Sequence, residues 1–303
     1  MKKITVVLSA YNEEKKIADC LASVKWADEI IVVDNSSTDK TKSIASRYTK
    51  HIYSKENNFM LNRNKNFGFS KANSEWILSL DADERVSPEL TEEIKSITQK
   101  GSENIVGYWI PRKNIIFGKW MQHTGWYPDL QLRLFKKGSG KFEEVHVHEM
   151  ISVSGDTEKL NNHIVHYNYD TISQFIYKHT EIYAPNEAET LLLKGYIFSP
   201  TDAINFPLKE FISRFFLREG YKDGFHGLVL SLLLSFYHLI IFTKIWEKRN
   251  FEEIKNINVL DDFSKEVKQN YKELSYWIAN EKIKETKNII KKIHLRVQRK
   301  ING

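Results

Sequence analysis

An apolar run of strand length ends abruptly on acidic residues in the stretch Trp76-Ile77-Leu78-Ser79-Leu80-Asp81-Ala82-Asp83. Because side chains alternate along an extended chain, Asp81 and Asp83 are expected to point the same way. Two neighbouring carboxylates repel each other unless a proton or a cation such as Mg²⁺ or Mn²⁺ lies between them. The stretch therefore predicts either an active-site metal at the end of a buried strand or a solvated acidic turn before a helix that begins at Pro88.

Strands alternate with helices over the first 100 residues. Strands are predicted at 4–8, 29–34, 51–53 and 76–80, and Asn12 is expected to cap the first helix. This alternation predicts a mostly parallel sheet with helices on both faces. Ligands bind at the carboxyl ends of the strands in such sheets. We therefore expect the loops 9–13, 34–37 and 81–83 to converge there.

The pattern changes after a predicted helix over 88–100. Strand-like segments follow, and from Thr171 the chain becomes helical. A chain of 303 residues can form one large domain or two small ones. We predict an α/β domain over residues 1–170 and a helical C-terminal region over 171–303. The strand-like segments of the second half of the first domain are 105–112, 130–135, 142–149 and 164–167.

The helical region contains an apolar segment, residues 225–243, without any Asp, Glu, Lys or Arg. Its length is borderline for spanning a bilayer, and its basic and aromatic flanks also fit a segment lying at the membrane interface. A core helix or one face of a dimer is the alternative. The net charge is +6, and residues 244–303 form a basic tail. Such a tail suits an anionic partner, a membrane surface or a nucleic acid, or is simply a solvated helix.

Cys20 is the only cysteine, so the chain has no internal disulfide and a reducing compartment is expected. The N-terminal apolar run 4–8 is too short for a signal peptide, and two glutamates follow it closely. These features predict a protein of the cytoplasm.

Several of these segments resemble one family as an ordered set: Ser9–Glu14, Val33–Asp39, Arg63-Asn64 and Ser79–Glu84. They are similar to motifs of family 2 glycosyltransferases with the GT-A (Rossmann-like) fold. The closer similarity is to lipopolysaccharide-core and lipooligosaccharide glucosyltransferases of the WaaE type. The resemblance covers about residues 1–250, and its distal motifs are Gln131-x-Arg133, Val147-His148-Glu149 and Glu219–Gly227.

The resemblance implies a binding site for a sugar nucleotide. Asp34, at a strand end, can accept a hydrogen bond from the N–H of a base, which favours uracil. The resemblance implies the same role for Asp34. Asp83 would hold the metal through the diphosphate, and Asp81 would face the ribose or the water shell of the metal. The residues implied around the uridine are Ser9, Tyr11 and Glu13.

A third metal ligand is expected from the segment 142–149. His146 and His148 share one face of an extended chain, and the likeness to a Val-His-Glu motif selects His148. Arg63 and Arg133 are expected to offer forked donors to a phosphate or to the acceptor. The remaining histidines of this region are left without a functional role: His163 and His166.

Inverting transfer requires one carboxylate to remove the proton of the acceptor hydroxyl. Asp129 is the first candidate, because it lies in an aromatic loop that can stack on a sugar. Glu149 is the second candidate. Asp129 could equally cap a helix or form a salt bridge, and the Glu-Asp pair of many family 2 enzymes is not visible in the sequence.

The sequence leads to the hypothesis of an inverting glycosyltransferase that depends on Mn²⁺ or Mg²⁺. Its donor would be a UDP-hexose, UDP-glucose or UDP-galactose, and its acceptor a lipopolysaccharide core or another lipid-linked glycan. The nucleotide-binding half would be about 1–100 and the acceptor half about 101–170. The enzyme is expected at the inner face of the cytoplasmic membrane, with segment 225–243 binding the membrane or forming a homodimer. No nucleic-acid partner is expected.

Two other functions are compatible with parts of the pattern. A nucleotidyltransferase that makes a sugar nucleotide has a similar topology, but a glycine-rich phosphate loop follows its first strand and residues 9–14 contain no glycine. A non-catalytic, membrane-tethered nucleotide-binding scaffold would bind the nucleotide without turnover. A phosphatase of the haloacid dehalogenase type is disfavoured, because its Asp-x-Asp pair would follow the first strand and here the pair follows a later one.

Overall fold

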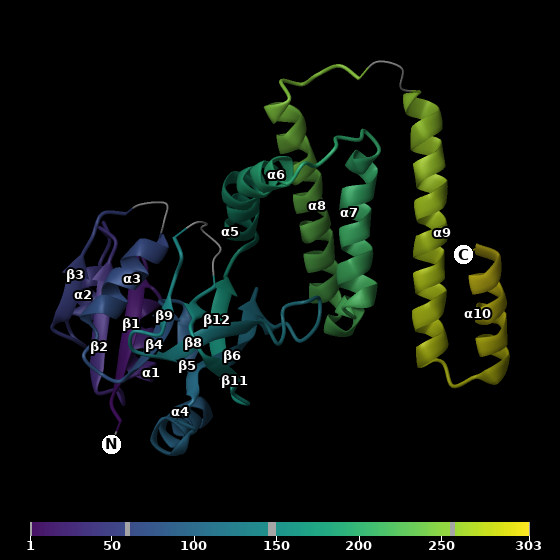
Figure 1. Ribbon diagram of the computed structural model, residues 1–303. Helices are drawn as coiled ribbons and strands as arrows, with labels where there is room; N and C mark the ends of the chain where they lie inside the picture. The colour runs from purple at the N-terminus through teal and green to yellow at the C-terminus, as the bar shows by residue number, and fades with distance from the viewer. Residues whose placement is uncertain (1, 58–60, 145–149, 255–257, 303) are drawn as a thin grey trace. The chain divides into compact units, whose positions relative to one another are not determined.

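The computed structural model describes residues 2–57, 61–144, 150–254 and 258–302 (Figure 1). The chain forms two compact units. Unit 1 comprises residues 1–116 and 126–168, and unit 2 comprises residues 117–125 and 169–303. Unit 1 contains the central sheet, and unit 2 is mainly helical.

Four parallel strands form the first part of the sheet in unit 1. Their spatial order is β3-β2-β1-β4, so the strand from the N-terminus lies near the middle. Side chains on both faces of β1, β2 and β4 are buried, which explains their almost continuous apolar sequences. The bounds are β1 Ile4–Ala10, β2 Glu29–Asp34, β3 His51–Ser54 and β4 Trp76–Asp81.

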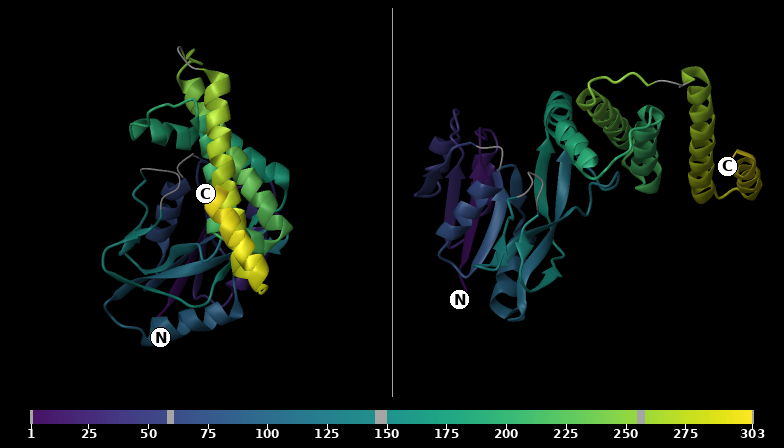
Figure 2. Two further views of the ribbon diagram at one scale, coloured as in Figure 1. Left: turned by 90° about the vertical axis from the view of Figure 1, so that its right-hand side faces the viewer. Right: turned by 45° about the horizontal axis from the view of Figure 1, so that its top comes forward.

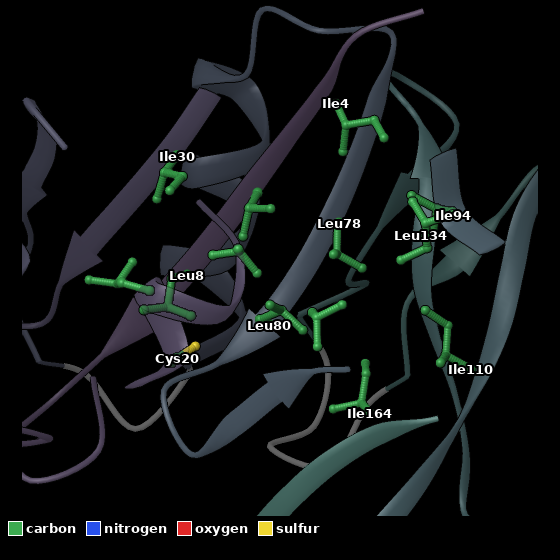
Figure 3. Packing of buried hydrophobic residues seen from close by; sticks show 14 of the residues in the cluster. Ile4, Leu8, Cys20, Ile30, Leu78, Leu80, Ile94, Ile110, Leu134 and Ile164 are labelled. Atoms are coloured by element: carbon green, nitrogen blue, oxygen red, sulfur yellow. The ribbon is translucent and has the colours of Figure 1, made fainter. Parts of the chain in front are cut away.

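Helices cover both faces of these strands. Residues of α1, α2 and α4 pack with one face of the strands in a core that includes Leu8, Leu78 and Leu80 (Figure 3). Phe69 and Ala72, on and just after α3, pack with Val7 and Ile31 on the other face. The helices are α1 Ile17–Ser23, α2 Thr41–Ala45, α3 Leu61–Lys71 and α4 Pro88–Lys100. The predicted α/β fold with helices on both faces is confirmed.

The second part of the sheet is largely antiparallel. Strand β8 runs antiparallel to β4 and to β6, and β12 runs antiparallel to β5. No helix lies between β6 and β8, so the chain has no crossover that would make these strands parallel. The whole order is β3-β2-β1-β4-β8-β6-β12-β5, with β11 parallel to β6. The bounds are β5 Glu84–Val86, β6 Ile105–Ile116, β8 Leu130–Lys136, β11 Asp156–Lys159 and β12 Ile164–Tyr169.

Two local predictions differ from the structure. Helix α1 begins at Ile17 and Asn12 does not cap it. The Asn12 side chain instead accepts a hydrogen bond from the backbone N–H of Thr38 at 2.9 Å, and Asn12 has a positive φ of 53°. The Asn12 side chain therefore connects two loops and does not cap the helix. The second difference concerns the predicted strand-like segment 142–149. Residues 142–144 form no strand, and residues 145–149 lie outside the described part. The remaining short strands are β7 Lys119–Trp120, β9 Gly140–Lys141 and β10 Ser152–Val153.

The helices of unit 2 begin after Thr171, as the sequence predicts. The Oγ1 of Thr171 accepts a hydrogen bond from the backbone N–H of Gln174 at 3.1 Å and so caps α5. Helix α8 packs with α6 through Ala184, Ala188, Ile241 and Ile245. The elements are α5 Ile172–Tyr177, π-helical η1 Lys178–Tyr183, α6 Ala184–Leu193, α7 Asp202–Ile212, π-helical η2 Ser213–Leu217, 3₁₀ turn η3 Gly220–Asp223 and α8 Phe225–Lys248.

Helix α8 is, within the described ranges, the helix that is long and apolar enough to cross a membrane. It has 24 residues, and its most apolar 18-residue stretch has a mean hydropathy of 2.0 and is 33% buried in the protein. After it, α9 (Val259–Glu285) and α10 (Ile289–Asn302) form a helical hairpin in which α10 runs back alongside α9 (Figure 2). The predicted helical C-terminal extension is confirmed.

Candidate active site

The carboxyl ends of three parallel strands meet at one edge of the sheet in unit 1. In the strand register Ala10 lies beside Asp34, and Ser9 lies beside Asp81. The loops that the sequence predicts to converge therefore do start side by side. This edge is where α/β sheets of this type bind their ligands.

A polar network stands at the ends of β1 and β2. The Asn35 amide nitrogen donates a hydrogen bond to Ser9 Oγ at 3.0 Å, and Asn35 Oδ1 accepts one from Asn64 at 2.7 Å. Asp34 is only 2% exposed and lies within 3.4 Å of the backbone nitrogen of Ser37. Tyr11 is 42% exposed at the same edge, so its ring is available to a ligand.

Glu13 and Arg63 lie at the margins of this edge. The backbone N–H of Glu13 donates to Thr41 Oγ1 at 2.7 Å, which fixes the loop after β1. Arg63 is largely exposed and its Nε lies 3.2 Å from Glu144 Oε2. The Glu13 backbone therefore contacts a distant segment, whereas Arg63 on α3 pairs with Glu144 and keeps 60% of its side chain exposed.

Asp81, the first acid of the Asp-x-Asp pair, is held by two cations. Its Oδ1 lies 2.5 Å from Lys65 Nζ, and its Oδ2 lies 2.5 Å from Arg133 Nη2. Burial raises the pKa of the Asp81 carboxyl, but the charges of Arg133 and Lys65 outweigh burial and hold this pKa well below its usual range. Asp81 is therefore ionised at neutral pH, with both oxygens already in ion pairs.

Glu84 connects this ion-pair cluster to the backbone. Its side chain is fully buried, and its Oε2 accepts a hydrogen bond from the backbone N–H of Asp81 at 2.9 Å. Its Oε1 accepts one from Arg133 at 2.8 Å and lies 3.5 Å from Arg112 Nη1. Glu84 thus positions both the acidic turn and the arginines beside it.

Asp83, the second acid of the pair, faces His166 from β12. The His166 Nε2 lies 3.4 Å from Asp83 Oδ2. On the other side of the ring, His166 Nδ1 lies 2.7 Å from Asn114 Oδ1. Burial raises the pKa of Asp83, and the facing imidazole more than offsets this, so that the pKa is lowered.

The partners of Asn114 decide which His166 nitrogen carries the proton. Asn114 Nδ2 donates to the carbonyl oxygen of Trp126 at 2.7 Å and to Asp129 Oδ2 at 2.9 Å. Asn114 Oδ1 must therefore accept, and His166 Nδ1 must donate. In a neutral imidazole the lone pair on Nε2 then points at the Asp83 carboxylate, which also only accepts. Two acceptors facing each other require a cation or a second proton between them.

This donor set fits a divalent cation. An imidazole nitrogen whose other nitrogen donates to an oxygen, together with a carboxylate, is a common half-site for metals of this kind. Within the described residues no group of three or more His, Cys, Asp or Glu side chains is arranged to hold a metal. The predicted third ligand His148, its alternative His146 and the second base candidate Glu149 lie outside the described residues.

Asp129, the first candidate for the base, accepts the hydrogen bond from Asn114 described above, and Asn114 in turn contacts His166. It lies 2.7 Å from Arg112 Nη2 and accepts a hydrogen bond from Gln131 at 3.1 Å. Burial raises the pKa of Asp129, but Arg112 and the neighbouring amides lower it further than burial raises it. The structure thus links Asp129 to Asp83 through Asn114 and His166.

A pocket of about 340 Å³ opens beside these groups. Among the described residues, Lys65, Arg112 and Arg133 line it against one lining carboxylate, Asp81. Glu84 and Asp129 offset the other two positive charges from outside the pocket, so the whole cluster is neutral and only the pocket lining carries an excess of cations. The surface that a ligand would meet is therefore positive, which suits a phosphate group. A cavity of about 480 Å³ at the amino ends of β1 and β2 lies away from the acidic pair.

The sequence missed five residues of this site: Lys65, Glu84, Arg112, Asn114 and His166. The fold and the site define a class of protein, an α/β enzyme with a positive pocket and an acidic pair at the carboxyl edge of its sheet. The model of Glycosyl transferase family 2 matches residues 5–156. The chain therefore belongs to this family, and the predicted membership is confirmed.

Relatives of known sequence extend the similarity over most of the chain. An uncharacterized glycosyltransferase of Rickettsia typhi is 30% identical over 260 residues, which cover 82% of this chain and 88% of the relative. The lipopolysaccharide core biosynthesis glycosyltransferase LpsC of Rhizobium meliloti is 22% identical, over 84% of this chain and 96% of LpsC. The predicted likeness to enzymes of lipopolysaccharide-core synthesis is thus confirmed at the level of similarity.

Among solved structures, the chain is similar to residues 1–349 of TarS from S. aureus. The TM-score is 0.41 at 15% sequence identity, and the match covers 84% of this chain and 93% of that chain.

Proposed function

We propose that the protein is an inverting, divalent-cation-dependent glycosyltransferase that uses a UDP-hexose, UDP-glucose or UDP-galactose. Its acceptor is a lipopolysaccharide core or another lipid-linked glycan, in keeping with the similarity to LpsC. The observation that carries the proposal is the pocket at the carboxyl edge of the sheet, whose charged lining residues are Lys65, Arg112, Arg133 and Asp81. Membership of the Glycosyl transferase family 2 supports glycosyl transfer as the reaction.

In this proposal the uridine lies over the ends of β1 and β2. Asp34 accepts a hydrogen bond from the uracil N–H, and the exposed ring of Tyr11 lies against the base. Ser9 and Glu13 complete the surroundings of the nucleoside. The diphosphate lies in the pocket against Lys65, Arg112 and Arg133, with Arg63 at the margin.

Asp83 and His166 are the residues that we propose to hold Mn²⁺ or Mg²⁺, with His148 as the third ligand predicted from the sequence. When bound, the cation would neutralise the charge that grows on the leaving diphosphate. Both oxygens of Asp81 are already in ion pairs with Lys65 and Arg133, so we place Asp81 beside the ribose or the water shell of the metal.

Transfer forms a bond between the acceptor oxygen and the anomeric carbon and breaks the bond from that carbon to the diphosphate. One carboxylate takes the proton of the acceptor hydroxyl. Asp129 is our first candidate, and its lowered pKa keeps it ionised at neutral pH while making it a weaker base. Glu149 is the second candidate.

The proposed location is the inner face of the cytoplasmic membrane, where lipid-linked acceptors are accessible. One face of α8 is buried in unit 2. Elsewhere on the helix Leu232 is 52% exposed and Phe236 is 47% exposed. This exposed part fits a membrane surface or a second copy of the chain. Sedimentation with and without lipid vesicles distinguishes the two.

The test is a donor screen with purified protein and Mn²⁺ against a panel of UDP-, GDP- and dTDP-sugars. Thermal stabilisation and slow hydrolysis are expected with UDP-hexoses, and an Asp129→Asn variant should bind the donor while losing transfer by on the order of 100-fold or more. Absence of a shift with every donor would contradict the proposal. Release of pyrophosphate from UTP and a sugar phosphate would indicate a nucleotidyltransferase, and binding without turnover a scaffold.

A further inference from the structure

Helix α10 has an unusual charge content. It carries five basic residues and no acidic residue between Ile289 and Asn302. Lys292, Arg296 and Lys300 are spaced four residues apart, so they follow one line along the helix. The complete basic set is Lys291, Lys292, Arg296, Arg299 and Lys300.

The same helix exposes an apolar stripe next to that line. Ile289 and Ile290 are 74% and 80% exposed, and Ile293 and Val297 are 55% and 52% exposed. At 3.6 residues per turn these four side chains lie on one side of the helix. Such a stripe is costly in water unless something covers it.

The opposite side of α10 packs against α9. Leu295 is only 6% exposed, and Arg299 donates a hydrogen bond to Asn280 Oδ1 at 2.8 Å. The hairpin with α9 therefore explains the inner side of α10 and leaves the apolar stripe outside, within the part of the chain that the structure describes. By contrast, α8 already packs one face within unit 2.

We propose that α10 lies flat on an anionic membrane surface. The isoleucine and valine side chains would insert at the level of the lipid head groups, and the basic residues would pair with lipid phosphates. A helix with one apolar face, a basic face and no acid is the composition that lies in the membrane interface.

Charge complementarity favours this partner over the two alternatives. A second copy of α10 would bring five more positive charges to the contact, and like charges repel. A nucleic acid would satisfy the basic residues but would leave the apolar stripe against a highly charged, hydrated surface. An anionic lipid surface can cover the apolar stripe and pair with the basic residues at the same time.

Co-sedimentation of the full-length protein with phosphatidylcholine vesicles, with and without phosphatidylglycerol, tests this proposal. We expect binding to the anionic vesicles, and loss of that binding when ionic strength rises from about 0.1 M to about 1 M, where the screening length falls to ~3 Å. The triple variant Lys292→Gln, Arg296→Gln, Lys300→Gln should bind on the order of 100-fold more weakly. The triple variant Ile290→Ser, Ile293→Ser, Val297→Ser should lose at least roughly tenfold in affinity for the anionic vesicles.

The matched control removes the same charge from α9, by Lys265→Gln, Lys268→Gln and Lys272→Gln, three exposed positions without acidic partners on α10. It should bind anionic vesicles nearly as the wild type does. Circular dichroism of each variant should match the wild type, because the substituted side chains of α10 are largely exposed. Nucleotide binding, measured separately, should be unchanged in all variants, so failure here is distinct from failure of the proposed function.

Three results would overturn the proposal. One is equal binding of the wild type and the basic-residue variant to anionic vesicles. Another is binding of duplex RNA or DNA through the same basic residues together with no binding to anionic vesicles. The third is a dimer in light scattering that the serine variant dissociates, because the stripe would then be an interface between copies.

Discussion

At the scale of single residues, Glu84 is the side chain on which the site geometry depends. It accepts hydrogen bonds from the Asp81 backbone and from Arg133, and it is fully buried. A buried ion pair contributes little net stability when complete, but removal of one partner leaves an uncompensated charge.

We therefore expect Glu84→Gln to lower the free energy of unfolding by about 3 kcal/mol, because Arg133 loses a buried counter-charge. Urea denaturation measures this change. The matched control is Glu75→Gln, since Glu75 forms an exposed pair with Lys2 at 3.3 Å, and a change below about 1 kcal/mol is expected. Equal effects of the two substitutions would contradict the role assigned to Glu84.

Asn114 is the residue that fixes the His166 tautomer. Asn114→Ala removes the acceptor of the Nδ1 proton, so we expect the affinity for Mn²⁺ to fall by about 10- to 100-fold. Affinity for UDP without metal should not change. Calorimetric titration measures both, with the exposed Asn104→Ala as control. An unchanged Mn²⁺ affinity in Asn114→Ala would contradict the role assigned to Asn114 in orienting His166.

The sequence identifies some site residues and not others for a physical reason. Asp34 and Asp81 end apolar strands, so local periodicity places them at the sheet edge. His166 reaches Asp83 only because β12 pairs with β5 in a register that sets His166 opposite Glu84. Such pairing between distant segments is not encoded in any local pattern, and so His166 had no predicted role.

At the scale of elements, α3 presents Lys65 to Asp81 because it lies very close to the sheet. A Cβ on Gly68 would lie 2.5 Å from Val7 Cγ1 and 3.0 Å from Val33 Cγ2. The glycine thus sets the distance between α3 and the strands β1 and β2.

Gly68→Ala is expected to destabilise unit 1 by about 1 to 3 kcal/mol, because the added methyl forces α3 away from the sheet. It should also weaken donor binding, since Lys65 moves with the helix. Urea denaturation and nucleotide titration measure these effects. Ser70→Ala, on the exposed side of α3, is the control and should change stability by less than about 0.5 kcal/mol. Stability of Gly68→Ala equal to that of the control would exclude this close packing.

The helical segment α5–η1 contains a buried histidine. His179 is 6% exposed, stacks on Phe175 with ring centroids 3.8 Å apart, and contacts the rings of Tyr183 and Tyr237. Burial lowers the pKa of His179 from 6.5 to about 4. The folded state therefore binds fewer protons than the unfolded state below pH 6.5, and stability decreases as the pH falls from 6.5 toward 4.

Between about pH 7.5 and about pH 5 we expect His179 to cost about 2 kcal/mol of stability. His179→Phe, which keeps an aromatic ring in place, should remove this part of the pH dependence. Urea titrations at the two pH values measure it, with the exposed His51→Gln as control. A pH dependence that is identical in wild type and His179→Phe would contradict the burial of a neutral ring.

Element boundaries were largely predictable because they depend on local signals. The predicted strand 29–34 and helix 88–100 coincide with β2 and α4, where Ser87 Oγ accepts a hydrogen bond from Leu90 and Pro88 opens the helix. The start of α1 was wrong, because a contact between two loops occupies Asn12. The antiparallel half of the sheet was also missed, since strand direction depends on connections that periodicity does not reveal.

At the scale of the whole molecule, the chain combines a positive, acid-edged pocket in unit 1 with a basic, apolar-striped helix in unit 2. This combination fits an enzyme that takes a water-soluble donor and acts on an acceptor held in a lipid surface. Both parts are needed for that account, and each can be tested alone.

The most direct test of the central claim is calorimetric titration of UDP in the presence of Mn²⁺, compared with the same titration in EDTA. We expect the wild type to lose most of its affinity in EDTA. Asp83→Asn and His166→Gln should lose on the order of 100-fold in the presence of Mn²⁺, while Asp129→Asn keeps wild-type affinity. Binding of UDP by the wild type that is equally tight in EDTA, or undiminished in Asp83→Asn, would contradict the account.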